Sequence, residues 1–334
     1  METAPPALPV RNALNEIAAA IVEADSIAVV SHTSPDGDAL GSVLGLYLSL
    51  TAMGKRCWAV NDDPVPWSLL FLPGADQIVN WDNVVAQGTP DLIVSLDCSD
   101  LKRTGLELTT GRRLPDVRLV EIDHHVTNTL FGSICCVDPE AACVGELVYD
   151  LVTVLGVTVD ADIATCLLTA HYTDTGSFQY SNVNRRTFTC ARNLLEAGGR
   201  HTEIARQVFR RKRYATARLW GLGLGTLQQD AGGKVVAAYV SLAMQQECGL
   251  VDEGTEGLVE YLAGIDGADL AVFFREASDG TVKVSCRTTP AIDATVIALM
   301  FGGGGHPRAA GCSLPGPLNA AKQRVLAEAV RMAS

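Results

Sequence analysis

Short apolar runs alternate with helix-forming stretches through the first half of the chain, and this alternation restricts the fold more than any other feature. Four runs have the length of buried strands and are bounded by turn residues, at positions 26–32, 55–60, 91–96 and 117–122. Apolar residues recur at helical spacing in three further stretches, at positions 39–53, 144–155 and 161–172. Gly54 would end the first of these helices. The alternation favours the α/β class, with a doubly wound, mainly parallel sheet covered on both faces.

The pattern changes near residue 186. Residues 186–227 have helical spacing and are polar and basic, and no strand is expected before residue 234. A second set of elements follows, with strands at 234–240, 270–276 and 281–287 and helices at 253–262, 293–300 and 320–332. At 334 residues the chain is long enough for two hydrophobic cores. We predict a first domain at 1–185, a helical linker at 186–227 and a smaller α/β domain at 228–334.

Charge limits the class of partner. The apolar content of 48% and the charged content of 19% are ordinary for a globular protein. The net charge of −12 provides no surplus of Lys and Arg for binding long duplex DNA. We interpret the one basic run, at 210–213, as a solvated helix face. A small substrate or a very short single strand fits this balance better.

Targeting signals and cysteine usage indicate the compartment. No apolar stretch is long enough to span a bilayer, and residues 1–9 lack the basic start of a signal peptide. The ten cysteines include no Cys-x-x-Cys pair, and most have apolar neighbours, so we interpret them as free core residues. These features predict a cytoplasmic protein that has no membrane partner.

Acidic and histidine residues cluster where elements of the first domain end. The clusters are His32, Asp36 and Asp38; Asp97; Asp123, His124 and His125; and Asp174. Singly, each has a simpler reading, because aspartates often cap helices or occupy turns and a lone histidine is more often structural. The carboxyl ends of strands line the crevice of an open α/β sheet, so the clusters should converge. Five aspartates and three histidines together exceed what capping explains, and their charge needs compensation.

Carboxylates and imidazoles without thiolates suit Mn²⁺, with Mg²⁺ or Co²⁺ as alternatives, rather than a structural zinc ion. Two such ions about 4 Å apart can activate a water molecule and stabilise a transferring phosphoryl group. Asp36 and Asp38 are suited to a metal pair, since two carboxylates on one tight turn can serve different ions.

The four clusters, in this order, resemble the motifs of the DHH phosphoesterase family, and residues 31–42 (SHTSPDGDALGS) are especially similar. The resemblance implies that one ion is held by His32 and Asp36, and the other by Asp38, His124 and Asp174. It also implies that Asp97 bridges the ions, that Asp123 orients the site from behind, and that His125 faces the substrate phosphate.

A glycine run lies in the second domain, within the sequence FGGGGHPRAAG at 301–311. Successive glycines can turn their backbone N–H groups toward an anion, although a flexible loop is the simpler reading. Candidate phosphate ligands there are Gly303, Gly304, Gly305, His306 and Arg308, with Arg287 at a strand end. The run resembles the GGGH-x-x-A-A-G signature of the DHH-associated C-terminal domain, which implies substrate binding.

One position departs from the family pattern. Gln179 stands where a basic residue is expected, and Arg103, Arg185 and Arg186 are the candidates to replace it. The resemblance implies an enzyme that hydrolyses short oligoribonucleotides or dinucleotides such as pApA, with 3′-phosphoadenosine 5′-phosphate as a further substrate. Alternatives are a cyclic-dinucleotide phosphodiesterase, a single-strand DNA exonuclease, an inorganic pyrophosphatase and a nucleotide sensor without turnover. A homodimer is compatible with the sequence.

Overall fold

The computed structural model describes residues 10–106 and 117–333. The chain divides into two compact units, Met1–Arg211 and Lys212–Ser334, and each is described by itself. The inference about a signal peptide rests on residues 1–9, which lie outside the described residues. No described helix is long and apolar enough to cross a membrane.

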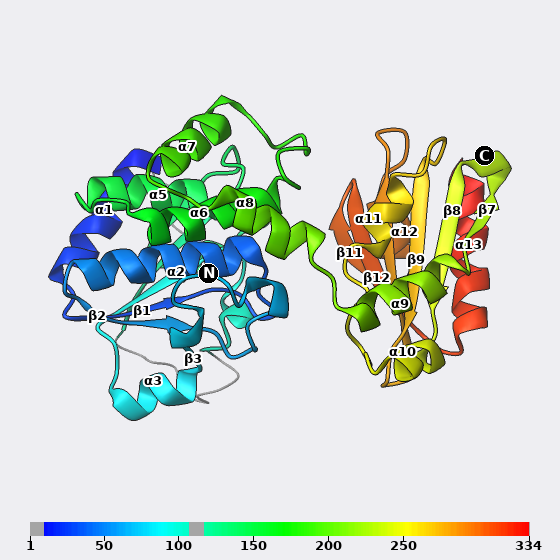
Figure 1. Cartoon of the computed structure of the whole chain (residues 1–334), viewed down its shortest axis with the longest axis horizontal. Helices are drawn as coiled ribbons and strands as arrows, with labels where there is room; N and C mark the ends of the chain where they lie inside the picture. Colours follow the sequence, from blue (N-terminus) through cyan, green and yellow to red (C-terminus); the bar gives the residue numbers. More distant parts are fainter. Residues whose placement is uncertain (1–9, 107–116, 334) are drawn as a thin grey trace, which may run out of the picture. The chain divides into compact units, whose positions relative to one another are not determined.

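The first unit contains a six-stranded sheet in which all strand pairs are parallel (Figure 1). Its strands are β1 (Ser26–Val30), β2 (Arg56–Val60), β3 (Ile78–Val79), β4 (Leu92–Leu96), β5 (Arg118–Asp123) and β6 (Ile134–Val137). The order is β3-β2-β1-β4-β5-β6, so the direction of winding reverses between β1 and β4. This confirms the doubly wound parallel sheet, and the four predicted strands are present within one or two residues at most ends.

Helices cover both faces of this sheet. On one face lie α1 (Val10–Glu23), α2 (Gly37–Ala52) and α5 (Val144–Val154), and on the other α3 (Trp81–Gln87). Helix α6 (Ala161–Asp174) packs on α2 and α5, and α7 (Arg185–Glu196) and α8 (His201–Ile204) pack on α6. Single turns complete the unit: η1 (Trp67–Leu69), η2 (Ala75–Gln77), η3 (Leu101–Thr104) and the π-helical η4 (Ala205–Arg210). Alternate residues of β1 enter opposite cores, Ile27 facing the larger helical layer and Ala28 the smaller layer that contains Trp81 of α3.

Helix α2 packs closely on α6, and two glycines permit it. A Cβ at Gly41 would lie 2.5 Å from the carbonyl oxygen of Cys166, and one at Gly45 would lie 2.5 Å from the Leu167 side chain. The close packing fixes the start of α2 relative to the end of α6, and both ends carry predicted metal ligands. Gly54 follows this helix with φ +75°, as its predicted end requires.

The second unit contains a mixed six-stranded sheet of order β11-β12-β10-β9-β8-β7, in which β8 and β9 are parallel and the other pairs antiparallel. The strands are β7 (Gln228–Asp230), β8 (Val235–Val240), β9 (Leu270–Glu276), β10 (Thr281–Thr288), β11 (Gly304–His306) and β12 (Ala309–Pro315). The helices are α9 (Tyr214–Leu224), η5 (Ala231–Gly233), α10 (Leu242–Cys248), α11 (Leu258–Ala263), α12 (Ala294–Met300) and α13 (Leu318–Ala333). One face packs on α12 and α13, and the other on α9 and α11.

Three expectations for this half were wrong. A strand, β7, precedes residue 234. The helix expected at 253–262 begins only at Leu258, because Asp252, Gly254 and Gly257 all have positive φ. The glycine run is not all loop, since β11 pairs with β12 in a hairpin. Within residues 186–227, Leu194 of α7 belongs to the core of the first unit and Leu219 of α9 to a core of the second.

Candidate active site

The carboxyl ends of β1 and β4 lie side by side where the strand order reverses, the place where open parallel sheets bind ligands. His32 follows β1 and Asp97 follows β4, and Nε2 of His32 lies 3.4 Å from Oδ2 of Asp97. Asp36 adds an Oδ1 atom 4.0 Å from the same nitrogen. These three side chains form one group whose ligand atoms are close enough to hold a metal ion.

A second group draws on three other elements. Nε2 of His124, which follows β5, lies 3.9 Å from Oδ2 of Asp38 in the first turn of α2. The same nitrogen lies 3.4 Å from Oδ2 of Asp174, the last residue of α6. It is also 3.7 Å from Oδ1 of Asp97. Asp97 therefore presents one carboxylate oxygen to each group, which is the arrangement that the motif resemblance implies.

Asp97 has two features that indicate a bound cation. Its side chain is buried, and Oδ1 accepts no hydrogen bond from the described residues. Its φ of +56° lies in the left-handed region that non-glycine residues rarely adopt. A buried acceptor without a partner costs free energy, and such backbone strain is found most often at functional sites. A divalent ion would satisfy this oxygen, so the residues present fit a metal centre.

The histidines are oriented for ligation through Nε2. Nδ1 of His32 lies 2.8 Å from the carbonyl oxygen of Thr33, and Nδ1 of His124 lies 3.1 Å from that of Ala141. A carbonyl can only accept, so each Nδ1 carries the proton and donates it. The lone pair of each Nε2 is then free for a metal ion, a common pattern in metal sites.

Backbone N–H groups hold the two carboxylates of the Asp36–Asp38 turn. Asp36 is the N-cap of α2 and accepts a hydrogen bond from the Ala39 N–H at 3.0 Å. Asp38 accepts hydrogen bonds from the N–H groups of Val144 and Gly145, at 2.8 and 3.1 Å, at the start of α5. Both aspartates thus accept hydrogen bonds from N–H groups at the start of a helix and also belong to a ligand group. The capping and the metal-binding interpretations of this turn are therefore compatible.

The protonation behaviour of the cluster reflects crowded negative charge. Burial, followed by the nearby carboxylates, raises the pKa of Asp38 well above its usual range. Burial also raises the pKa of Asp174 to about 7, with Asp97 and Asp36 adding to the effect against the opposing influence of His124. Carboxylates that bind protons this readily also favour binding of cations.

Asp123 lies behind the cluster and is fully buried. Its Oδ1 lies 2.8 Å from Nδ1 of His125, and its Oδ2 accepts a hydrogen bond from Nδ2 of Asn128 at 2.6 Å. Burial would raise the pKa of Asp123, but the hydrogen bonds from His125 and Asn128 outweigh it and lower the pKa. The hydrogen bond to Asp123 in turn raises the pKa of His125 to about 9. The sequence does not predict a role for Asn128, five residues after Asp123, because an isolated asparagine gives no signal.

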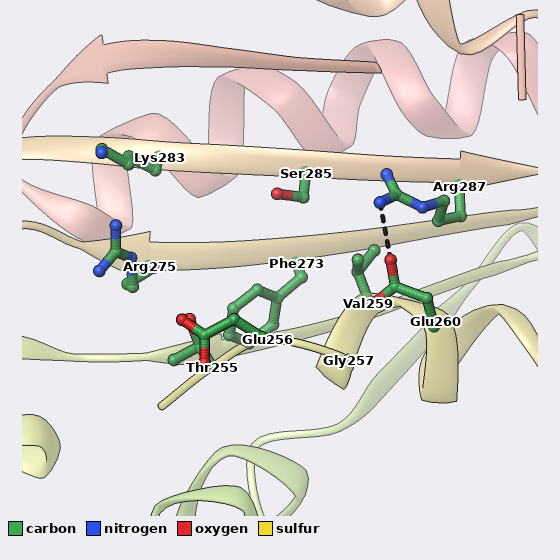
Figure 2. Close-up of a pocket in the computed structure, with 10 residues that line it drawn as sticks. All are labelled: Thr255, Glu256, Gly257, Val259, Glu260, Phe273, Arg275, Lys283, Ser285 and Arg287. Atoms are coloured by element: carbon green, nitrogen blue, oxygen red, sulfur yellow. Dashed lines mark hydrogen bonds and ion pairs between the residues drawn. The ribbon is translucent and has the colours of Figure 1, made fainter. Parts of the chain in front are cut away.

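In the second unit, Arg287 lines a pocket of about 340 Å³ on the face of the sheet that packs on α11. Figure 2 shows Lys283, Ser285 and Arg287 along β10, with Arg275 beside Lys283 on β9. Lys283, Ser285 and Arg287 alternate with core-facing residues of β10, so the period of the strand places these three side chains on one face. Arg287 already donates to Oε1 of Glu260 at 2.7 Å, a contact that its sequence position did not predict.

The glycine run has mainly packing roles in the described structure. The N–H groups of Gly302 and Gly303 donate to carbonyls of α12 and end that helix, so they do not point toward a ligand. A Cβ at Gly303 would lie 2.1 Å from the carbonyl oxygen of Gly311, and one at Gly305 2.6 Å from that of Ala309. The glycines are therefore needed for close approach to β12, which corrects the expectation of a nest across the whole run.

The other candidate phosphate ligands are placed differently from one another. Gly304 and His306 are exposed in β11, and within the described residues the His306 side chain has no hydrogen bond or ion pair. Arg308 instead donates to the carbonyl oxygens of Thr289 and Ile292, the latter at 2.7 Å, and so fixes the turn before α12.

The arginines that are candidates to replace the basic residue expected at position 179 also differ in their contacts. The Gln179 side chain donates to the carbonyl of Gly176 at 2.8 Å. Arg103 lies in η3, and its carbonyl accepts a hydrogen bond from the N–H of Thr33, next to His32. Arg186 forms ion pairs with Asp138 and Asp150 at 2.7 and 2.8 Å. Arg186 is therefore engaged within the protein, while Arg103 stays a candidate.

Comparison with known proteins identifies the family. Residues 26–171 match the N-terminal domain of the DHH family, and residues 230–333 match the DHHA1 domain. The bifunctional oligoribonuclease and PAP phosphatase NrnA of Thermus thermophilus is 37% identical over 309 residues, covering 91% of this chain and 89% of that protein.

Two solved structures place the fold in context. The crystal structure of an exopolyphosphatase-related protein from Bacteroides fragilis superimposes with a TM-score of 0.88 at 28% identity, over 96% of both chains. RecJ from Thermus thermophilus in complex with Mn²⁺ shares the fold, with a TM-score of 0.57 at 19% identity over 98% of this chain and 56% of RecJ. The chain belongs to the DHH family of phosphoesterases and carries the DHHA1 domain in its second half.

Proposed function

We propose that this phosphoesterase hydrolyses short oligoribonucleotides and dinucleotides such as pApA with two divalent ions, and also removes phosphate from 3′-phosphoadenosine 5′-phosphate. The observation that carries the proposal is Asp97, whose two carboxylate oxygens face separate groups of ligands. His32 and Asp36 would hold one ion, with Asp38, His124 and Asp174 on the other. Mn²⁺ suits this donor set, and it is the ion in the RecJ complex.

Bound divalent ions would activate a water molecule and neutralise charge on the phosphoryl group. Asp123 fixes the ring of His125 through Nδ1, which leaves Nε2 to donate a hydrogen bond outward. Because Nδ1 is already used, we assign His125 to the substrate phosphate rather than to a metal ion. A cationic donor held in advance stabilises the charge that develops on the phosphate oxygens.

The pocket of the second unit supports a nucleotide substrate. Lys283 lies directly opposite Arg275 in the β10–β9 pair, and like charges at such positions repel. Asp252, 3.5 Å from Arg275, offsets part of this repulsion. A phosphate group would offset more of it and would also compete with Glu260 for Arg287. Gly304 and His306 are also exposed, in the short strand β11 of the same sheet. The net charge of −12 provides no extended basic track, so short strands are favoured.

Two observations support this substrate class and a cytoplasmic location. The relative at 37% identity carries the name oligoribonuclease and PAP phosphatase, and it matches this chain across both domains. All ten cysteines are free and most are buried, as predicted and as expected in a reducing compartment.

A substrate panel tests the proposal. Initial rates with Mn²⁺ would be compared for pApA, a trimer, a pentamer, a 30-mer, cyclic di-AMP and 3′-phosphoadenosine 5′-phosphate, with EDTA as the blank. We expect the dimer to pentamer to be cut fastest per strand end. Equal rates for the trimer and the 30-mer would refute short-strand preference, and faster cutting of cyclic di-AMP would favour the cyclic-dinucleotide alternative. Tight binding without any turnover would favour a sensor.

A further inference from the structure

Residues 182–186 follow the last predicted ligand, Asp174, and run into the start of α7. They contact a loop that holds two of the predicted ligands. We propose that this stretch, called the anchor segment, positions the metal ligands from outside the site. The inference rests on the metal centre of the proposed function. The anchor segment makes its contacts through Asn182, Asn184 and Arg186, and none of these residues belongs to a ligand group.

This loop, called the support loop, spans residues 138–145, which are the connection after β6 and the first two residues of α5, and it holds two ligands directly. The carbonyl oxygen of Ala141 fixes Nδ1 of His124 at 3.1 Å. The N–H groups of Val144 and Gly145 fix both oxygens of Asp38. A shift of this loop by a fraction of an ångström would move both ligands, so its own attachment matters for metal affinity.

The anchor segment attaches the support loop at three points. The amide of Asn184 donates to the carbonyl of Glu140 at 2.9 Å, and Arg186 donates to Oδ2 of Asp138 at 2.7 Å. The amide of Asn182 donates to the carbonyl of Ala142 at 3.0 Å.

Asn182 also reaches a third ligand. The same nitrogen donates to the backbone carbonyl of Asp174 at 3.0 Å. One amide group therefore connects the support loop, with His124 and Asp38, to the end of α6, with Asp174. These are the three side chains of the second ligand group.

Arg186 and Asn184 have further contacts, which makes Asn182 the cleanest position to test. Arg186 also pairs with Asp150 at 2.8 Å and lies 3.4 Å from the buried Glu146, so its removal would leave a buried carboxylate uncompensated. Asn184 caps α7 by accepting hydrogen bonds from two backbone N–H groups. Asn182 is exposed, and within the described residues its side chain forms hydrogen bonds with these two carbonyls.

The experiment compares Mn²⁺ binding by the full-length wild type and Asn182→Ala, using isothermal titration and electron paramagnetic resonance. Loss of a group hydrogen-bonded directly to a ligand side chain weakens metal binding about 10- to 100-fold, and Asn182 acts one contact further out, so the loss should lie at the lower end of that range. We expect that loss in Asn182→Ala, an unchanged melting temperature in EDTA, and activity that recovers as Mn²⁺ is raised. Asn193→Ala is the matched control, since the Asn193 side chain contacts only its neighbour Arg192 among the hydrogen bonds described.

Arg186→Lys is the second variant, because lysine keeps the charge but loses the planar fork that joins the carboxylates. It should also weaken Mn²⁺ binding while the metal-free fold persists. Binding within twofold of the wild type in both variants would overturn the inference and leave the proposed function intact. If the wild type itself bound no Mn²⁺, both would be overturned together.

Discussion

The ligand cluster of the first unit and the basic pocket of the second are both charged, but their charges are balanced in different ways. The cluster concentrates carboxylates whose pKa values are raised by burial and mutual repulsion. In the pocket, cations have carboxylate partners within the protein: Arg287 pairs with Glu260 at 2.7 Å, and Arg275 with Asp252 at 3.5 Å. The cluster therefore favours a bound cation, or protons where no metal ion is bound, while the pocket can exchange one anion for another.

The comparison predicts different penalties for damage. Side chains of the cluster are fixed by backbone groups at strand and helix ends, so one loss should remove the chemistry. Side chains of the pocket lie along one face of β10 and β9, and we expect the effects of losing them to be smaller and graded. Mutations in the first unit should thus change kcat, and mutations in the second should change substrate affinity.

The largest effect is expected for Asp97→Ala. Because Asp97 faces both ligand groups, its removal should lower activity on pApA by several orders of magnitude and reduce the Mn²⁺ stoichiometry. Asp76→Ala is the control, since Asp76 lies in η2 and contacts the neighbouring Gln77. Substantial turnover by Asp97→Ala, or by the wild type in excess EDTA, would rule out the two-metal reading.

His125→Ala should have the second largest effect on activity. Loss of one positioned hydrogen-bond donor to a developing negative charge typically costs about 10²- to 10³-fold in kcat, and KM should change little if His125 acts mainly on the transition state. Steady-state kinetics on pApA would measure the split, with the exposed His201→Ala as control. If the variant instead changed only KM, His125 would be a substrate-binding residue, and the predicted difference between the two units would not hold.

Arg287→Ala should have an intermediate effect of another kind. Loss of one charge-assisted hydrogen bond costs about 1.5–3 kcal/mol, or roughly 10- to 150-fold, mainly in kcat/KM for nucleotide substrates. Bis-p-nitrophenyl phosphate has no distal phosphate, so its hydrolysis should survive in this variant and in His306→Ala. The exposed Arg331→Ala is the control. Loss of generic ester hydrolysis would place the second unit within the catalytic machinery.

The contrast also explains what could be predicted from sequence. Strand ends in a parallel sheet meet at one edge, so His32 and Asp97 could be expected to converge although 65 positions separate them. The partners of Arg287 and Arg308 could not be expected, because a glutamate in α11 and two carbonyls before α12 have no motif. The glycine run was recognisable, but the need of Gly303 for close packing depends on β12 across the hairpin.

The short elements show the same limit. Strands β3 and β6 have only two and four residues, too few for a periodic signal, and neither was predicted. The start of α11 was misplaced because glycines at 254 and 257 adopt positive φ, which apolar spacing does not encode. Asn128 and Asn182 were missed for a related reason, since an amide that supports a site does so through contacts made only in the folded chain.

The smallest expected effect concerns pH and the metal-free fold. The raised pKa values of Asp38, Asp174 and His125 mean that the folded protein binds protons more tightly than the unfolded chain at each of these groups. Stability without metal should therefore fall as pH rises from about 6 to 9, by a few degrees of melting temperature at about 2–4 °C per kcal/mol. The lowered pKa of Asp123 acts only in acid, outside this window.

Melting temperatures in EDTA at a series of pH values would measure this slope, and Asp174→Asn should flatten it. Saturating Mn²⁺ should reverse the slope, since protons then compete with the metal. A metal-free protein whose stability rises across this range would show that the cluster is balanced internally, as the pocket is.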